Sequence, residues 1–112
     1  MIQQRDIWLV PFPFSDQSGN KVRPVVVISH DAFNQFSEDV LVIGLTSQLS
    51  TGRYVIPVSA KDVSGGELRH DCYVKVENVL KISQKLVRKK IGQLNPQKFN
   101  DTIRAFESII HT

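Results

Sequence analysis

Two apolar runs in this sequence end in polar residues, and those polar residues are the candidates for chemistry. Arg23 stands just ahead of the run 25–28, and the run 40–45 is followed by three polar residues, Thr46, Ser47 and Gln48. If the two strand ends are neighbours, a guanidinium and hydroxyls share one site. A guanidinium offers five donors in a planar fork that suits phosphate oxygens, and a hydroxyl both donates and accepts. The combination indicates phosphodiester chemistry.

Each of these residues also has an ordinary explanation when taken singly. Arg23 is as easily a surface arginine at the start of a strand. Threonine suits strands and serine suits turns, whether or not they take part in chemistry. The functional interpretation therefore depends on the conjunction of the three types at two neighbouring strand ends.

Length and composition limit the classes of protein that remain. The 112 residues predict one domain, 1–112, and any sizeable groove then needs a second copy, most simply in a twofold dimer. A net charge of +3 permits a polyanionic partner. The single cysteine excludes an internal disulfide, and no Cys and His spacing suggests a metal or other cofactor. No signal peptide or membrane span is recognisable, so the sequence predicts a soluble cytoplasmic protein.

The elements that must position the polar residues are mostly short strands. The runs 25–28 and 40–45 are apolar without alternation, which is typical of central strands covered on both faces. The segment 7–14 is also strand-like, but its prolines at 11 and 13 favour an edge or a bend. Further strands are predicted in four places, at 54–58, 73–76, 78–82 and around Ile91, with a turn at 64–66.

The chain ends in one predicted amphipathic helix. Asn95 is a good N-cap and Pro96 suits the first helical position. Apolar residues then recur at helical spacing, at Phe99, Ile103, Phe106 and Ile110. Short strands with one terminal helix predict a mainly β fold, a small antiparallel sheet curled toward a barrel with the helix packed on it.

A wholly polar segment, 15–21, separates the first two strands and leads toward Arg23. It is either a plain connector or a flap over the site. In the second interpretation Phe14, at its start, stacks on a nucleobase, and Asp16 and Lys21 contact the same phosphodiester substrate. Trp8 and Phe12 are aromatic too, but burial suits them better.

The ordered set of motifs resembles the MazF/PemK family of toxin endoribonucleases. The motifs are Asp6-Ile7-Trp8, Val22-Arg23-Pro24 with the apolar run behind it, Leu45-Thr46-Ser47-Gln48, and Asp71 ahead of Tyr73-Val74. The resemblance covers almost the whole chain. It implies an SH3-like barrel, a homodimer, and cleavage of single-stranded RNA at a short sequence without a metal ion.

The resemblance also implies site residues and partners. The family's catalytic arginine and threonine fall on Arg23 and Thr46, and Glu77 and Asn78 match positions that contact RNA or the partner subunit. Ser47 and Gln48 are further RNA-binding candidates. The implied partner is an antitoxin whose acidic, partly disordered tail occupies the RNA groove, with DNA binding only through the antitoxin complex. Two positions depart from the family's pattern, Arg5 in place of glycine and Cys72 in place of serine.

The expected reaction is attack of a ribose 2′-hydroxyl on the adjacent phosphorus, which gives a 2′,3′-cyclic phosphate and a 5′-hydroxyl. Arg23 fits charge stabilisation, because a guanidinium stays charged and is a poor base. Among the histidines, His70 is the candidate for a role in the site, or else a solvated turn residue. A basic run, Lys85, Arg88, Lys89 and Lys90, either tracks a phosphate backbone or is a solvated face.

Two other functions remain open at this point. Gyrase-poisoning toxins share the fold, but they act through a C-terminal tail with a tryptophan, whereas this chain ends in Ser-Ile-Ile-His-Thr. A noncatalytic barrel that binds RNA or an acidic peptide would use Arg23 as a simple anchor. Bound but uncut RNA would distinguish that second case.

Overall fold

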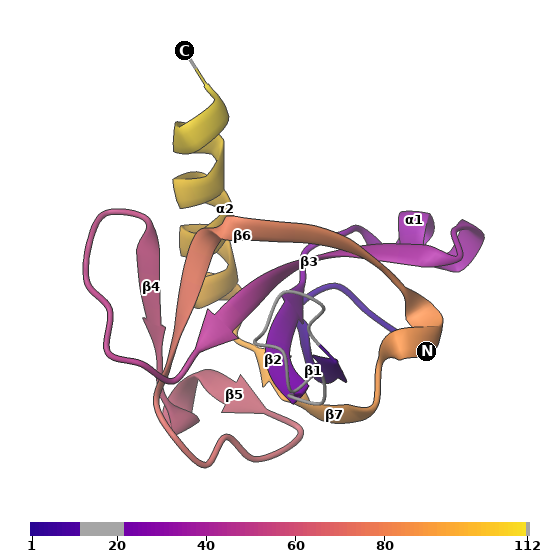
Figure 1. The fold of residues 1–112 in the computed structure, drawn as a ribbon, viewed down its shortest axis with the longest axis horizontal. Helices are drawn as coiled ribbons and strands as arrows, with labels where there is room; N and C mark the ends of the chain where they lie inside the picture. The colour runs from indigo at the N-terminus through magenta and orange to yellow at the C-terminus, as the bar shows by residue number, and fades with distance from the viewer. Residues whose placement is uncertain (12–21, 112) are drawn as a thin grey trace.

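The fold is an antiparallel β-sheet curled into a nearly closed barrel with a C-terminal helix (Figure 1). The computed structural model describes residues 1–11 and 22–111. The described strands run in the order β4-β6-β3-β2-β1-β7-β5. Their bounds are β1 Asp6–Pro11, β2 Val22–Val27, β3 Asp39–Thr46, β4 Val55–Val58, β5 Val63–Ser64, β6 Cys72–Ser83 and β7 Lys89–Leu94. The helices are α1 Asp31–Phe36 and α2 Pro96–Ile110, with single 3-10 turns η1 Ala60–Asp62 and η2 Gln84–Leu86.

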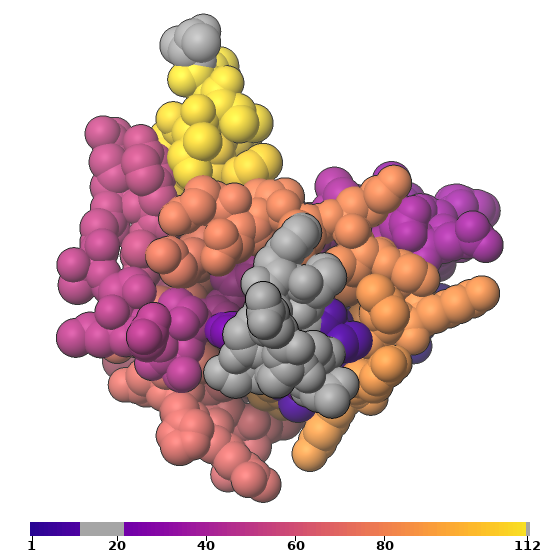
Figure 2. Space-filling model, viewed as in Figure 1, coloured from indigo at the N-terminus to yellow at the C-terminus, as the bar shows by residue number. Residues whose placement is uncertain are grey.

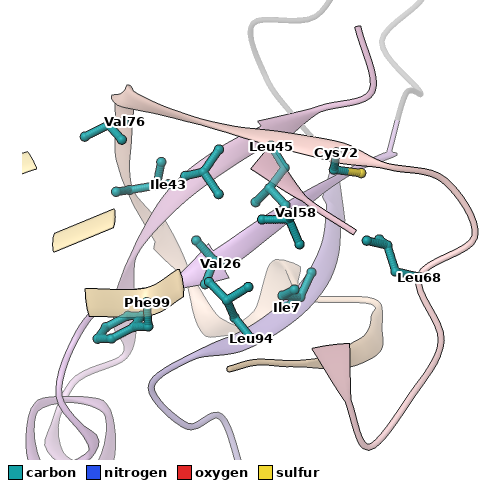
Figure 3. Close-up of a cluster of buried hydrophobic side chains, with 11 residues drawn as sticks. Ile7, Val26, Ile43, Leu45, Val58, Leu68, Cys72, Val76, Leu94 and Phe99 are labelled. Carbon is teal, nitrogen blue, oxygen red and sulfur yellow. The ribbon is translucent and has the colours of Figure 1, made fainter. Parts of the chain in front are cut away.

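Strands β2 and β3 lie at the centre of the sheet, as their apolar runs predict. They pair in an antiparallel register that includes Val25 with Gly44 and Val27 with Val42. Successive residues of β2 enter two apolar clusters: Val26 belongs to the first, with Phe99 of α2 (Figure 3), and Val25 and Val27 belong to the second. A buried valine contributes roughly 1.5–3 kcal/mol. Burial on both faces explains why these runs do not alternate.

Strand β1 was predicted to lie at an edge or bend, and the edge assignment holds only for its last two residues. It pairs with β2 on one side and with β7 on the other. The pairing with β7 ends at Leu9, whereas that with β2 continues to Pro11. A proline is tolerated here because the ladder with β7 no longer needs a donor at this position. Pro13 lies outside the described residues.

The two short strands predicted between positions 73 and 82 form one strand of 12 residues, β6. Its register against β3 breaks in the middle: Leu45 pairs with Val74, but Ile43 pairs with Val79. Four residues of β6 therefore lie opposite one residue of β3. Such an excess bends a strand sharply, and the bend is visible in Figure 1.

Helix α2 begins as its sequence predicts. The Asn95 side chain accepts a hydrogen bond from the Lys98 N–H at 2.7 Å, and Pro96 occupies the first turn. Phe99 is buried in the first cluster, whereas Ile110 is 63% exposed. The predicted apolar face therefore packs over its first three turns only, because the last turn extends past the sheet (Figure 1).

Helix α1 has no counterpart in the sequence-based prediction. It has six residues, too few for a helical period to be recognised, and Phe36 is 89% exposed. Buried hydrogen bonds stabilise it instead: the Asn34 amide donates to the Ser29 carbonyl at 3.0 Å. Across the described residues, no helix is both long and apolar enough to span a membrane.

Candidate active site

The register of the central strands places Arg23 opposite Thr46. The pairs that join β2 to β3 run from Val27–Val42 to Val25–Gly44. The ladder pairs end there, and the same register continued by two residues would set Arg23, in β2, against Thr46, the last residue of β3. Residues directly opposite each other in an antiparallel pair have Cβ atoms about 5 Å apart on one face. The antiparallel pairing thus brings the start of β2 and the end of β3 to the same edge of the barrel.

The pair is part of a row that crosses four strands. Arg23 pairs with Val10 of β1, and Thr46 pairs with Tyr73 of β6. Val10 is buried in the second cluster, so one end of the row is part of the apolar core. The other three residues, Arg23, Thr46 and Tyr73, are half-buried. Tyr73 was predicted from the sequence only as part of a strand motif, because only the ladder register reveals that it neighbours Thr46.

The hydroxyl of Thr46 is oriented by the local backbone. Its Oγ1 accepts a hydrogen bond from the Gln48 N–H at 3.1 Å. A hydroxyl that accepts one bond still has a proton to donate and a second lone pair. Thr46 can therefore donate to a phosphate oxygen while the turn fixes it. Ser47 and Gln48 follow in that turn and are exposed.

Glu77 and Asn78 lie further along β6, at its bend, and both are exposed. Glu77 is four residues beyond Tyr73 and lies within the bent part of the strand. Its carboxylate is 3.9 Å from the Lys75 ammonium. The structure thus places these two residues outside the Arg23–Thr46 row but on a strand that passes through it.

The remaining predicted residues are divided between described and undescribed parts of the chain. Phe14, Asp16 and Lys21 lie outside the described residues. His70 is described, is exposed, and shares a pocket with Ser47. Within the described residues, no three His, Cys, Asp or Glu side chains form a group that could hold a metal ion.

Part of the basic run lies near this strand end. In the pairing of β7 with β1, Lys89 is opposite Leu9 and Lys90 is opposite Trp8. The Lys90 ammonium is 3.3 Å from Oδ1 of Asp6, which is fully buried. Lys89 is exposed and carries a positive charge next to the row that contains Arg23. The sequence could not show this, because the partner strand of β7 is far away in the chain.

Asp6 explains why an aspartate stands at the start of β1. Its carboxylate accepts hydrogen bonds from the Gln3 N–H at 2.9 Å, the Trp8 indole at 3.2 Å and the Gln93 amide at 3.2 Å. Together with the Lys90 ammonium, four groups therefore interact with this carboxylate. A buried charge is costly unless it is paired and hydrogen-bonded in this way. Asp6 thereby joins the N-terminal turn to β7.

Comparison with known proteins identifies the family. Residues 3–110 match the family described as "PemK-like, MazF-like toxin of type II toxin-antitoxin system". The chain belongs to this family. An endoribonuclease MazF from Staphylococcus saprophyticus is 25% identical over 111 residues, which cover 96% of this chain and 89% of that protein.

Solved structures of family members share the fold of this chain. A mycobacterial endoribonuclease in complex with its cognate antitoxin has a TM-score of 0.80 at 15% identity and covers 98% of this chain and 95% of its own. The Mycobacterium tuberculosis toxin MazF-mt6 has a TM-score of 0.78 at 19% identity, with coverage of 95% and 96%. The predicted mainly β barrel with a C-terminal helix is therefore confirmed.

Two departures from the family's pattern have structural explanations in this member. Arg5 adopts φ 78°, a left-handed conformation that favours glycine, and its guanidinium donates to the Leu94 carbonyl at 2.9 Å. Cys72 is buried, and its thiol donates to the His70 carbonyl at 3.4 Å. Burial, and then the Asp71 carboxylate, raise the pKa of the Cys72 thiol above its ordinary value of 9.0. The thiol is therefore protonated at neutral pH and is not a nucleophile.

Proposed function

We propose that this toxin-family member is a sequence-specific endoribonuclease that cleaves single-stranded RNA without a metal ion. The observation that supports this best is the cross-strand opposition of Arg23 and Thr46 at the ends of β2 and β3. A charged fork and a hydroxyl donor held on paired strands are preorganised for a phosphate. Preorganised donors to a developing negative charge are worth on the order of 10²–10³-fold in rate each.

In this mechanism the RNA supplies its own nucleophile. The ribose 2′-oxygen forms a bond to phosphorus and loses its proton, while the bond from phosphorus to the 5′-oxygen breaks and that oxygen gains a proton. The products are a 2′,3′-cyclic phosphate and a 5′-hydroxyl. Arg23 stabilises the extra charge on the five-coordinate phosphorus, and Thr46 donates to a phosphate oxygen. Ser47, Gln48, Glu77 and Asn78 bind the flanking RNA, together with Phe14, Asp16 and Lys21.

We further infer that the protein acts in the cytoplasm as a homodimer and is neutralised by an antitoxin with an acidic tail. The net charge of +3 suits such a tail. Apolar residues remain exposed at the end of α2, where Ile109 and Ile110 are 41% and 63% exposed, and a second copy would cover them. Antitoxin complexes of structural relatives are consistent with the partner.

The decisive experiment incubates the protein with a long, weakly structured RNA in excess chelator and maps the new ends. We expect cuts at one short motif with cyclic phosphate ends. The Arg23→Ala variant should lose cleavage by at least about 100-fold. The matched control is Arg104→Ala, which removes an exposed arginine paired only with Asp101 on α2.

Each other result leads to a different conclusion. If the chelator abolished cleavage, the proposal that the enzyme needs no metal ion would be wrong. If wild type and Arg23→Ala cleaved equally well, Arg23 would not have the proposed role of stabilising charge on the phosphorus. RNA that is bound but never cut would indicate a noncatalytic barrel, and absence of both binding and cleavage would reject an RNA-directed function.

A further inference from the structure

The pocket that His70 shares with Ser47 begins beside the Arg23–Thr46 row, on the other face of the same strand ends. It has a volume of about 510 Å³ and is bounded by Pro24 and Ser47, the residues that follow Arg23 and Thr46. We call it the flanking pocket. Its size lies in the range of small-ligand sites. A polymer that passes around these strand ends can contact both the Arg23–Thr46 row and this pocket.

The floor of the flanking pocket is apolar. Leu9 and Pro24, which are paired across β1 and β2, lie next to Leu68 and Ile91 in its lining. Leu68 is buried and belongs to the first cluster, so this floor is part of the folded core. A flat apolar surface of this kind accepts the face of a nucleobase, which gains by leaving water.

The rim of the flanking pocket is cationic. Arg69, Lys89 and Lys90 line it, and Glu67 is the one acidic residue in the lining. Asp6 compensates Lys90, whereas Arg69 and Lys89 are exposed at the rim. Figure 2 shows the segments concerned, with the residues around 65–70 in salmon at the lower edge and β7 in orange beside them. Arginine and lysine at a groove margin are the usual donors to a nucleic-acid backbone.

The flanking pocket is preformed because its rim segment is anchored to β7. A Cβ on Gly66 would lie 1.7 Å from the Ile91 carbonyl oxygen, so only glycine permits this close approach. The next residue, Glu67, donates its N–H to that same oxygen at 2.9 Å. At the other end of the segment, the Cys72 thiol donates to the His70 carbonyl. A preformed rim spares the entropy of ordering a loop upon binding.

We propose that the flanking pocket holds a nucleotide just outside the cleavage motif, with the base on the apolar floor and a phosphate on Arg69 and Lys89. This inference rests on the proposed function. An acidic peptide would use the cations alone, whereas the pocket offers an apolar floor and cations together. The combination favours RNA over a peptide.

The test compares two RNAs that contain the mapped cleavage motif, a long one and one trimmed to the motif. The double variant Arg69→Ala/Lys89→Ala removes both cations of the rim, and Lys81→Ala/Arg104→Ala removes two exposed cations elsewhere as the control. On the long RNA we expect the first double variant to lose about tenfold in kcat/KM, mostly through KM. In a plot of log KM against the logarithm of the salt concentration, the slope should become shallower by about 0.7 for each phosphate contact that is lost. On the trimmed RNA both double variants should match wild type.

The other outcomes overturn the inference in distinguishable ways. An equal loss on both RNAs would place the two cations in the active site itself. No loss on either RNA, with weaker binding of an acidic peptide, would assign the flanking pocket to the antitoxin. If wild type does not cleave RNA, binding of the same two RNAs is measured instead. Weaker binding of the long RNA alone by the Arg69→Ala/Lys89→Ala variant would support the nucleotide site and contradict the proposed enzymatic activity. Unchanged binding of both RNAs would contradict both proposals.

Discussion

The two ends of the β2–β3 strand pair carry similar polar side chains and use them in opposite ways. At the end near α1, the Ser29 hydroxyl donates to Asn34 and accepts from the Leu41 N–H at 3.1 Å. There the Gln84 amide also donates to backbone carbonyls, those of Asn34, Ser37 and Asp39, at 2.8, 2.9 and 3.3 Å. At the other end, Ser47 and Gln48 are exposed beside the half-buried Thr46.

The difference shows that burial decides the role of a polar residue, whatever its type. A buried polar side chain is costly unless protein partners satisfy it, and it then stabilises one local structure. Across the described residues, every buried side-chain nitrogen or oxygen has such a partner. The α1 end is thus closed and structural, whereas the Arg23 end keeps hydroxyl and amide groups available to a ligand.

The largest expected effect is at the open end. Arg23→Lys keeps the positive charge and removes the planar fork, so we expect cleavage to fall by about 10²-fold. The free energy of unfolding should change by less than about 0.5 kcal/mol, as is usual away from the core. Single-turnover cleavage and urea unfolding measure the two quantities. Near-full activity of the lysine variant would argue against a bidentate contact.

At the closed end we expect the reverse pattern. Gln84→Glu replaces an amide donor by a carboxylate that faces the Asn34 and Ser37 carbonyls. The variant loses these hydrogen bonds and places carboxylate oxygens, which can only accept, next to carbonyl oxygens. The free energy of unfolding should therefore fall by about 2–4 kcal/mol. Activity per folded molecule should be unchanged. A control, Lys85→Gln, lowers the charge by the same one unit at the neighbouring exposed position. Equal stability of the two variants would contradict the assigned role of Gln84.

Arg5 offers an internal counterpart to Arg23, because its guanidinium bonds to the protein's own backbone. Arg5→Ala loses the bond to the Leu94 carbonyl and keeps the left-handed backbone, so it should lower the free energy of unfolding by about 1 kcal/mol. Arg5→Gly loses the same bond but relieves about 1 kcal/mol of strain. Thermal unfolding should therefore rank glycine above alanine, with cleavage unchanged in both. The opposite ranking would mean that φ 78° carries no strain here.

The smallest expected effect concerns Cys72 and pH. Because the folded-state pKa of this thiol is raised, the unfolded chain ionises first as pH increases. Its contribution to stability is complete below pH 9.0 and declines above it. Cys72→Ser should remove part of the stability loss above pH 9.0. Parallel pH dependences of urea unfolding in the two proteins would show that the thiol does not contribute.

The sequence predicted those features that depend on local or strongly periodic signals. The unbroken runs of β2 and β3 identified the centre of the sheet, and Asn95 with Pro96 marked the start of α2. Arg23 and Thr46 could be paired in advance because each stands at the end of a recognisable run. These signals lie within a few residues of the element that they specify.

The features that the sequence did not predict depend on contacts distant in the chain. Helix α1 is stabilised by the Gln84 side chain, about fifty positions away. The pairing of β7 with β1 brings Lys89 beside Leu9, and the bend of β6 places Tyr73 beside Thr46. Tertiary contacts of this kind override local propensity and leave no periodic pattern in the sequence. The flanking pocket was missed for the same reason.

The placement of Arg23 and Thr46 within paired strands also has an evolutionary consequence. Their separation is set by the β2–β3 ladder and by apolar residues such as Val25, which would change face if the register slipped by one. Insertions or deletions in the surrounding loops can therefore accumulate without altering the spacing of the two groups. Under the proposed function, a lineage with this architecture can diversify the RNA sequences that it recognises while its bond-breaking chemistry stays the same.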